Sequence, residues 1–216
     1  MTNLHAWREL GFSPYFRKKP SNESAGLKQQ QWQALEAKVQ NCTLCRLHET
    51  RTQTVFGVGD KNADWLFVGE GPGEQEDLKG EPFVGPAGKL LDEMLRALGL
   101  SRLKNVYIAN AVKCRPPQNR TPKPDEMETC LPYLLEQVRL IEPNIIVALG
   151  KTAALGLLKR DEALAKLRGN VHTFEGIPLV ITYHPAYLLR SPAEKKKSWD
   201  DLQLAWRIFN GNSTAG

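Results

Sequence analysis

Four cysteines are the clearest candidates for a chemical role in this sequence. They form a Cys-x-x-Cys pair and two single positions further along the chain: Cys42, Cys45, Cys114 and Cys130. Four thiolates can bind a zinc ion or an iron–sulfur cluster, and the spacing alone does not choose between them. The alternative is a set of unligated core cysteines, but the neighbours of the first pair are polar: Asn41, Thr43, Arg46 and His48. The sequence therefore favours a metal site.

Polar segments that follow four short apolar runs are the second candidate for chemistry. The apolar runs cover residues 65–68, 106–109, 145–149 and 179–183. The polar segments after them are 69–77, 110–117, 150–152 and 184–187. Short apolar runs of this kind predict buried strands. Because the carboxyl ends of parallel strands meet at one edge of a sheet, we expect these segments to lie together.

Three side chains at these positions suit the recognition of a nucleobase. The amide of Asn110 can both donate and accept hydrogen bonds, so it could read a base edge. Phe83 could stack on a base, and His184 should face the acidic loop 69–77. Each has a structural alternative: a turn or cap for the asparagine, packing for the phenylalanine, and a core position for the histidine.

Two glycine-containing segments resemble nucleotide-binding loops but fail on their spacing. The segment after the first run has Glu76 where a dinucleotide fingerprint requires its third glycine, and its acids would repel a pyrophosphate. The segment 150–152 resembles the end of a phosphate-binding loop, but Ile145 occupies the position of the first glycine. We therefore interpret both segments as strand-to-helix connections.

The elements that must position these residues alternate between strands and helices. Helical patterns cover residues 27–40, 90–98, 127–141, 151–158 and 191–209. This alternation predicts an α/β domain with a mostly parallel sheet that helices cover on both faces. We expect one domain over residues 31–210, an N-terminal extension over 1–30 and a C-terminal tail over 211–216.

Composition limits the classes of function. The 216 residues carry a net charge of +5 and a pI near 9.0, which suits a polyanionic partner such as nucleic acid. We find no apolar run of the length that a membrane span needs. The first 20 residues lack the apolar stretch of a secretory signal, so we expect a cytoplasmic protein with reduced thiols.

Taken together, four segments resemble the family 4 uracil-DNA glycosylases, the iron–sulfur branch of their superfamily. These segments are residues 68–74 (VGEGPGE), 82–88 (PFVGPAG), 110–117 (NAVKCRPP) and 184–190 (HPAYLLR). The match runs from about Asn41 to about Arg207, and the four cysteines fall in the family's register. Several independent segments in the right order make the resemblance specific. Residues 1–30 lie outside it.

The resemblance implies a three-layer α/β/α sandwich with a central four-stranded parallel sheet and one 4Fe–4S cluster, held by the four cysteines. It implies removal of uracil from DNA, with Glu70 and His184 as catalytic residues. Glu76 and Asp77 are alternative carboxylates. The implied uracil-binding residues are Gly71, Phe83, Asn110 and His184. For contact with the DNA backbone we expect Gly85, Gly88, Arg115, Arg120 and Arg190. Residues 188–190 could wedge into the base stack.

Other interpretations remain open at this point. The protein could be a non-catalytic, metal-containing module that binds nucleic acid, or an iron–sulfur oxidoreductase with a nucleotide cofactor. A superfamily relative that traps uracil covalently would need a histidine between Cys114 and Cys130, and residues 115–129 contain none. Under the favoured interpretation the partner is uracil-containing DNA, single- or double-stranded. The protein would act as a monomer associated with the nucleoid.

Overall fold

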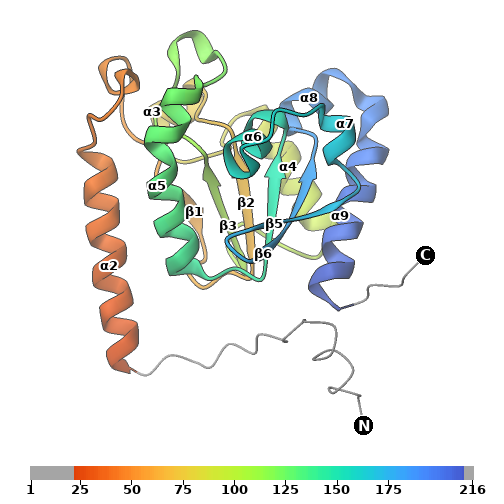
Figure 1. The fold of residues 1–216 in the computed structure, drawn as a ribbon, viewed down its shortest axis with the longest axis horizontal. Helices are drawn as coiled ribbons and strands as arrows, with labels where there is room; N and C mark the ends of the chain where they lie inside the picture. Colours follow the sequence, from red (N-terminus) through yellow and green to blue (C-terminus); the bar gives the residue numbers. More distant parts are fainter. Residues whose placement is uncertain (1–21, 212–216) are drawn as a thin grey trace.

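The computed structural model describes residues 22–211 (Figure 1). Most of the expected N-terminal extension, residues 1–21, and most of the expected tail, residues 212–216, lie outside this range. The first described helix, α2 (Asn22–Gln40), begins five residues before the predicted helix. It therefore includes the last part of the segment that we assigned to the extension.

Within residues 22–211 the strands form one six-stranded sheet. The strand order is β1 (Val58–Gly59), β3 (Val106–Asn110), β2 (Trp65–Gly69), β4 (Ile145–Leu149), β6 (Ile177–Thr182) and β5 (Val171–Phe174). The four central strands pair in parallel, which confirms the predicted parallel sheet. The two edge strands are antiparallel and were not predicted. One is only two residues long, and two of the four residues of the other are solvent-exposed.

Helices cover both faces of the sheet, which confirms the three-layer α/β/α sandwich (Figure 1). One face packs against α2, α5 (Pro124–Ile141), α6 (Lys151–Leu158) and α7 (Leu164–Leu167). The other packs against α4 (Pro86–Ala97) and α9 (Lys195–Phe209). Strand β2 shows why the strands are apolar throughout: Leu66 and Val68 join the first core, and Trp65 and Phe67 join the second.

Short helices lie in the loops that connect these elements. They are η1 (Arg46–Glu49), α3 (Glu74–Lys79), η2 (Pro117–Asn119), α8 (Pro185–Arg190) and η3 (Pro192–Glu194). Two of them, α3 and α8, follow the carboxyl ends of β2 and β6, so the polar segments identified from the sequence begin at one edge of the sheet. None of the helices in the described range is long and apolar enough to cross a membrane.

Candidate active site and cysteine cavity

A pocket of about 520 Å³ opens at the carboxyl ends of the central strands. Eight of the residues singled out from the sequence line it: Glu70, Gly71, Glu76, Phe83, Asn110, Arg120, His184 and Arg190. Gly85, Gly88 and Arg115 are not among the lining residues. The segments after β2, β3 and β6 therefore meet at this pocket as predicted, whereas residues 150–152 are not among its lining residues. The pocket size is ordinary for a small-molecule or single-base site.

His184 is the N-cap residue of helix α8, and the helix holds its ring in one orientation. Its Nδ1 atom accepts a hydrogen bond from the backbone N–H of Ala186 at 3.1 Å. A backbone amide can only donate, so the proton of the neutral imidazole must be on Nε2. Burial lowers the pKa of His184, while the charge of nearby Glu70 acts in the opposite direction. The ring is therefore a neutral donor at the wall of the pocket.

Asn110 ends strand β3 and is 2% exposed. Its side-chain Oδ1 is buried and has no hydrogen-bond partner among the residues that the structure describes. An unpaired buried acceptor costs free energy of folding, so its presence at a pocket indicates an atom that accepts a hydrogen bond from a ligand. Gly69 makes room for it, because a Cβ atom at that position would lie 2.4 Å from the same oxygen.

Phe83 is held against the pocket by an unusual backbone. Its φ angle is +56°, in the left-handed region that residues other than glycine rarely adopt. Its ring lies 5.5 Å from the ring of His184, tilted by 31°. The structure explains why residue 88 is a glycine, because a Cβ atom there would lie 1.7 Å from the carbonyl oxygen of Phe83. The left-handed turn thus depends on the close approach of the first turn of α4.

Two charged side chains hold the backbone around this phenylalanine. Glu76 Oε1 accepts from the backbone N–H groups of Val84 at 2.9 Å and Gly85 at 3.1 Å. On the other side, Arg102 donates to the carbonyl oxygens of Pro82 and Phe83. Sequence reasoning did not identify Arg102, because an arginine in a connecting turn carries no motif of its own.

The three candidate carboxylates have different surroundings. Both oxygens of the buried Asp77 accept the backbone N–H of Thr52 at 3.0 Å, so this carboxylate fixes a neighbouring loop. It does not line the pocket. Glu76 lines the pocket, but one of its oxygens holds the 83–85 turn. Glu70 lines the pocket close enough to His184 for its charge to affect the histidine pKa.

The expected DNA-contacting arginines also differ in their surroundings. Arg120 forms a bidentate pair with Glu126 at 2.6 and 2.8 Å, which holds the pKa of that carboxyl below its usual range. Arg115 donates to Asn119 at 2.7 Å. Arg190 lines the pocket at the end of α8. Of the two leucines before it, Leu188 is buried and Leu189 is 44% exposed, so Leu189 is the accessible member of the expected wedge.

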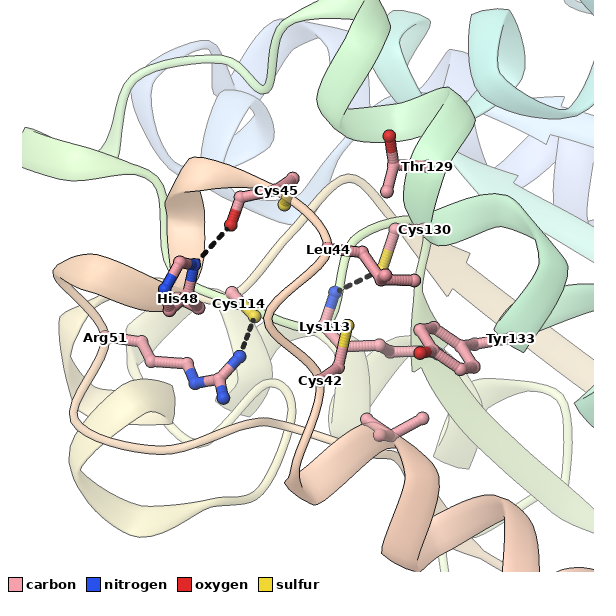
Figure 2. A pocket seen from close by; sticks show the side chains of 11 residues that line it. Cys42, Leu44, Cys45, His48, Arg51, Lys113, Cys114, Thr129, Cys130 and Tyr133 are labelled. Atoms are coloured by element: carbon pink, nitrogen blue, oxygen red, sulfur yellow. Dashed lines mark hydrogen bonds between the residues drawn. The ribbon is translucent and has the colours of Figure 1, made fainter.

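The four cysteines line a second cavity (Figure 2). Two of their sulfur atoms accept hydrogen bonds. The guanidinium Nη1 of Arg51 donates to Cys114 Sγ at 3.0 Å, and the backbone N–H of Lys113 donates to Cys130 Sγ at 3.3 Å. Burial raises the pKa of the Cys130 thiol to about 12, and the neighbouring Lys113 opposes that rise. Arg51 was not identified from the sequence, since its partner is 63 positions away.

The four sulfur atoms surround the cavity without meeting at one point. Among residues 22–211, no three side chains of histidine, cysteine, aspartate or glutamate converge closely enough to hold a single metal ion. All four cysteines line this one cavity, and thiolates are ligands of both zinc ions and iron–sulfur clusters.

Comparison with known proteins identifies the family. The family model described as the uracil DNA glycosylase superfamily matches residues 56–203. The chain belongs to this superfamily. A type-4 uracil-DNA glycosylase of Archaeoglobus fulgidus is 44% identical over 173 residues, which cover 76% of this chain and 86% of the relative. The type-4 uracil-DNA glycosylase of Thermotoga maritima is 49% identical over 156 residues, which cover 71% and 81%.

These relatives confirm the resemblance to the type-4 branch. A type-5 uracil-DNA glycosylase of Pyrobaculum aerophilum is also similar, at 34% identity over 146 residues, 60% of this chain and 64% of the relative. The superfamily match spans the pocket residues from Glu70 to Arg190 and includes Cys114 and Cys130. In this uracil-DNA glycosylase, residues far apart in sequence thus form one pocket, and the four cysteines form a separate cavity beside it.

Proposed function

We propose that this uracil-DNA glycosylase hydrolyses the N-glycosidic bond of deoxyuridine in single- or double-stranded DNA through Glu70, Asn110 and His184. The products are free uracil and an abasic site, the first step of base excision repair. The observation that carries the proposal is that one pocket contains both an unsatisfied acceptor, Asn110 Oδ1, and a neutral imidazole donor, that of His184. These two groups match the hydrogen-bonding edge of uracil.

Recognition begins with extraction of the base. A base within a duplex is out of reach, so the nucleotide flips into the pocket at a cost of a few kcal/mol. Phe83 and Gly71 form part of the wall that receives it, and Phe83 stacks on the ring. Asn110 Oδ1 accepts from uracil N3–H, and its amide NH2 donates to O4. Cytosine reverses both partners, so the site discriminates against it.

Bond cleavage places negative charge on uracil and positive charge on the sugar. His184 Nε2–H donates to uracil O2, and this bond strengthens as the N1–C1′ bond breaks. One well-placed donor of this kind contributes about 3–4 kcal/mol in comparable oxyanion sites. Glu70 offsets the charge of the sugar and orients the water that attacks C1′. Glu76 and Asp77 are less suited, because their oxygens hold backbone N–H groups.

The second part of the proposal is one 4Fe–4S cluster in the cysteine cavity, held by Cys42, Cys45, Cys114 and Cys130. The residues present fit it: thiolate ligands surround a common cavity, and Arg51 and Lys113 supply donors to two of the sulfur atoms. Such a cluster carries net negative charge, which these cations offset. Its role is to brace the loop of Cys42 and Cys45 against the segments of Cys114 and Cys130.

DNA is the partner, and the contacts with its backbone come from several elements. Arg120 and Arg190 line the pocket, and so does Ala87, which lies in the first turn of α4 between Gly85 and Gly88. Arg115 and Arg120 exchange some of their protein partners for phosphates, while Leu189 fills the space left by the flipped nucleotide. We further propose that the protein acts as a monomer in the cytoplasm, where it associates with the nucleoid.

The test of the proposed function is direct. Metal-loaded protein is incubated with an oligonucleotide that contains one deoxyuridine, and alkaline cleavage then reveals any abasic site. We expect cleavage at the uracil position in both single-stranded and duplex substrates, and none with thymidine or deoxycytidine at that position. Absence of cleavage by folded, metal-loaded protein would contradict the proposal and favour a non-catalytic nucleic-acid-binding role.

A further inference from the structure

Phe83 adopts a backbone conformation that must be enforced from outside. For a residue with a large side chain, a φ angle of +56° is unfavourable and persists only where surrounding structure over-determines it. Two side chains hold the turn from opposite directions. Glu76 accepts from the N–H groups that follow Phe83, and a guanidinium group binds the carbonyl groups at and before it.

That guanidinium belongs to Arg102, in the connection between α4 and β3. Its Nη2 atom donates to Phe83 O at 2.8 Å and its Nη1 atom to Pro82 O at 3.2 Å. Its Nε atom donates to Asp92 Oδ1 on α4 at 2.8 Å, which fixes the plane of the group. The side chain of Arg102 is only 19% exposed. A lysine ammonium could not reach all three acceptors in this planar arrangement.

We propose that Arg102 is a positioning residue of the glycosylase, which holds Phe83 in its left-handed turn so that the ring is preorganised to receive the flipped base. Asp92 orients Arg102. The inference rests on the proposed stacking role of Phe83. A change in the backbone of Phe83 would move its ring out of the pocket wall, because the ring lies between His184 and the end of β2. A Cβ atom on Gly69 would lie 2.7 Å from Phe83 Cζ.

The experiment is a double-mutant cycle under single-turnover conditions with excess metal-loaded enzyme. It compares the wild type, Arg102→Lys, Phe83→Ala and the double variant on a duplex that contains one deoxyuridine. The measured quantities are the cleavage rate at saturating enzyme and the enzyme concentration at half saturation. Asp92→Asn is a second probe of the same contact. Arg96→Lys is the matched control, because Arg96 pairs with Glu93 on the exposed face of α4.

Arg102→Lys is expected to lower the saturating rate about tenfold, since it removes part of a charged hydrogen-bond fork. The half-saturating concentration should stay unchanged, because phosphate contacts carry most of the affinity. Asp92→Asn should give a smaller loss of rate, and Arg96→Lys none. The double variant should be no slower than Phe83→Ala, because Arg102 acts through the aromatic ring.

Additive losses in the double variant would overturn the inference, as would a wild-type rate for Arg102→Lys beside a slow Phe83→Ala. A lowered melting temperature of Arg102→Lys with an unchanged rate would also overturn it, because the role would then be structural only. A wild-type rate for Phe83→Ala would instead overturn the proposed stacking itself. The failure of the positioning role and the failure of the proposed function are therefore distinguishable.

Discussion

His184 accepts the backbone N–H of Ala186 on its Nδ1 atom, and this one bond gives the histidine two roles. It caps helix α8, and it leaves Nε2 as the atom that carries the proton. Protonation of Nδ1 would require loss of the cap, in addition to the burial of a charge. The residue is thus suited to act as a neutral donor rather than as an acid that gives up its proton.

The first prediction concerns pH. Because burial lowers the pKa of His184, its neutral form should persist in the folded protein below the ordinary histidine pKa of about 6.5. We expect the pH dependence of the cleavage rate to show no ionisation of His184 near pH 6.5. At that pH, ¹⁵N NMR should show the signal of the Nε2–H tautomer. Titration of His184 at its ordinary pKa would contradict the assignment.

A conservative variant separates the two roles of this histidine. Asparagine is a good N-cap, so His184→Asn should keep α8 but lose the imidazole Nε2–H donor, with a cleavage rate about 10²- to 10³-fold lower. The unfolded wild type gains a proton as pH falls below about 6.5 while the folded state does not, so its stability falls in this range. The variant should lack this part of the pH dependence, which chemical denaturation at several pH values measures.

The second prediction separates activity from stability at Asn110. Asn110→Ala should lower the cleavage rate about 100-fold or more, because the site loses its contacts with N3–H and O4. The free energy of unfolding should change by less than about 1 kcal/mol, because the variant also removes an unpaired buried oxygen. Denaturant unfolding and single-turnover cleavage give the two values.

Asn144 provides the matched control for this variant. Its side-chain amide donates to Asp64 at 2.7 Å, away from the pocket. Asn144→Ala should therefore destabilise the fold by about 1 kcal/mol and leave the cleavage rate of the folded protein unchanged. The reverse outcome, with a large loss of stability in Asn110→Ala and little loss of rate, would refute the base-reading role.

The third prediction concerns the carboxylate at the pocket. Glu70→Gln keeps the size of the side chain but removes its charge, so the cleavage rate should fall about 10²- to 10⁴-fold, the range for a positioned general base. Glu74→Gln is the control, since Glu74 is largely exposed and lies near Arg115. Equal rates for Glu70→Gln and the wild type would remove Glu70 from the mechanism and leave Glu76 as the next carboxylate to examine.

The fourth prediction concerns metal. Protein isolated without oxygen should be brown and contain iron and acid-labile sulfide in equal amounts. Removal of the iron by a chelator should lower the melting temperature and the cleavage rate together, because the ligands tie Cys42 and Cys45 to the β3–α5 connection. Colourless, zinc-containing protein with full activity would overturn the assignment of the cluster and leave that of the pocket intact.

The sequence predicts the central part of the fold because buried parallel strands are apolar on both faces. Strand β4 is an example: Ile145 and Val147 pack on one face and Ile146 and Ala148 on the other. The edge strands are different. Strand β5 has two exposed residues out of four, and its hairpin with β6 depends on positive φ angles at Glu175 and Gly176, which composition does not reveal.

Glu70, Asn110 and His184 could be found because they lie at or just after the carboxyl ends of strands, where side chains reach the open edge of the sheet. The residues that hold them could not. Arg102 and Arg51 bind a backbone carbonyl and a sulfur atom that are distant in sequence, and neither contact leaves a pattern. The packing role of Gly88 was also hidden, because it depends on how closely α4 approaches the carbonyl of Phe83.

Lys113 connects the cysteine cavity with the pocket that Asn110 lines. Its backbone N–H meets the sulfur of Cys130, and its buried Nζ atom donates to the carbonyl oxygen of Asn110 at 3.0 Å and to Gln137 at 2.6 Å. Oxidation converts a cysteine thiol into a larger and more polar group. We expect such a change at Cys130 to shift Asn110, the proposed base-reading residue, because Lys113 contacts both residues.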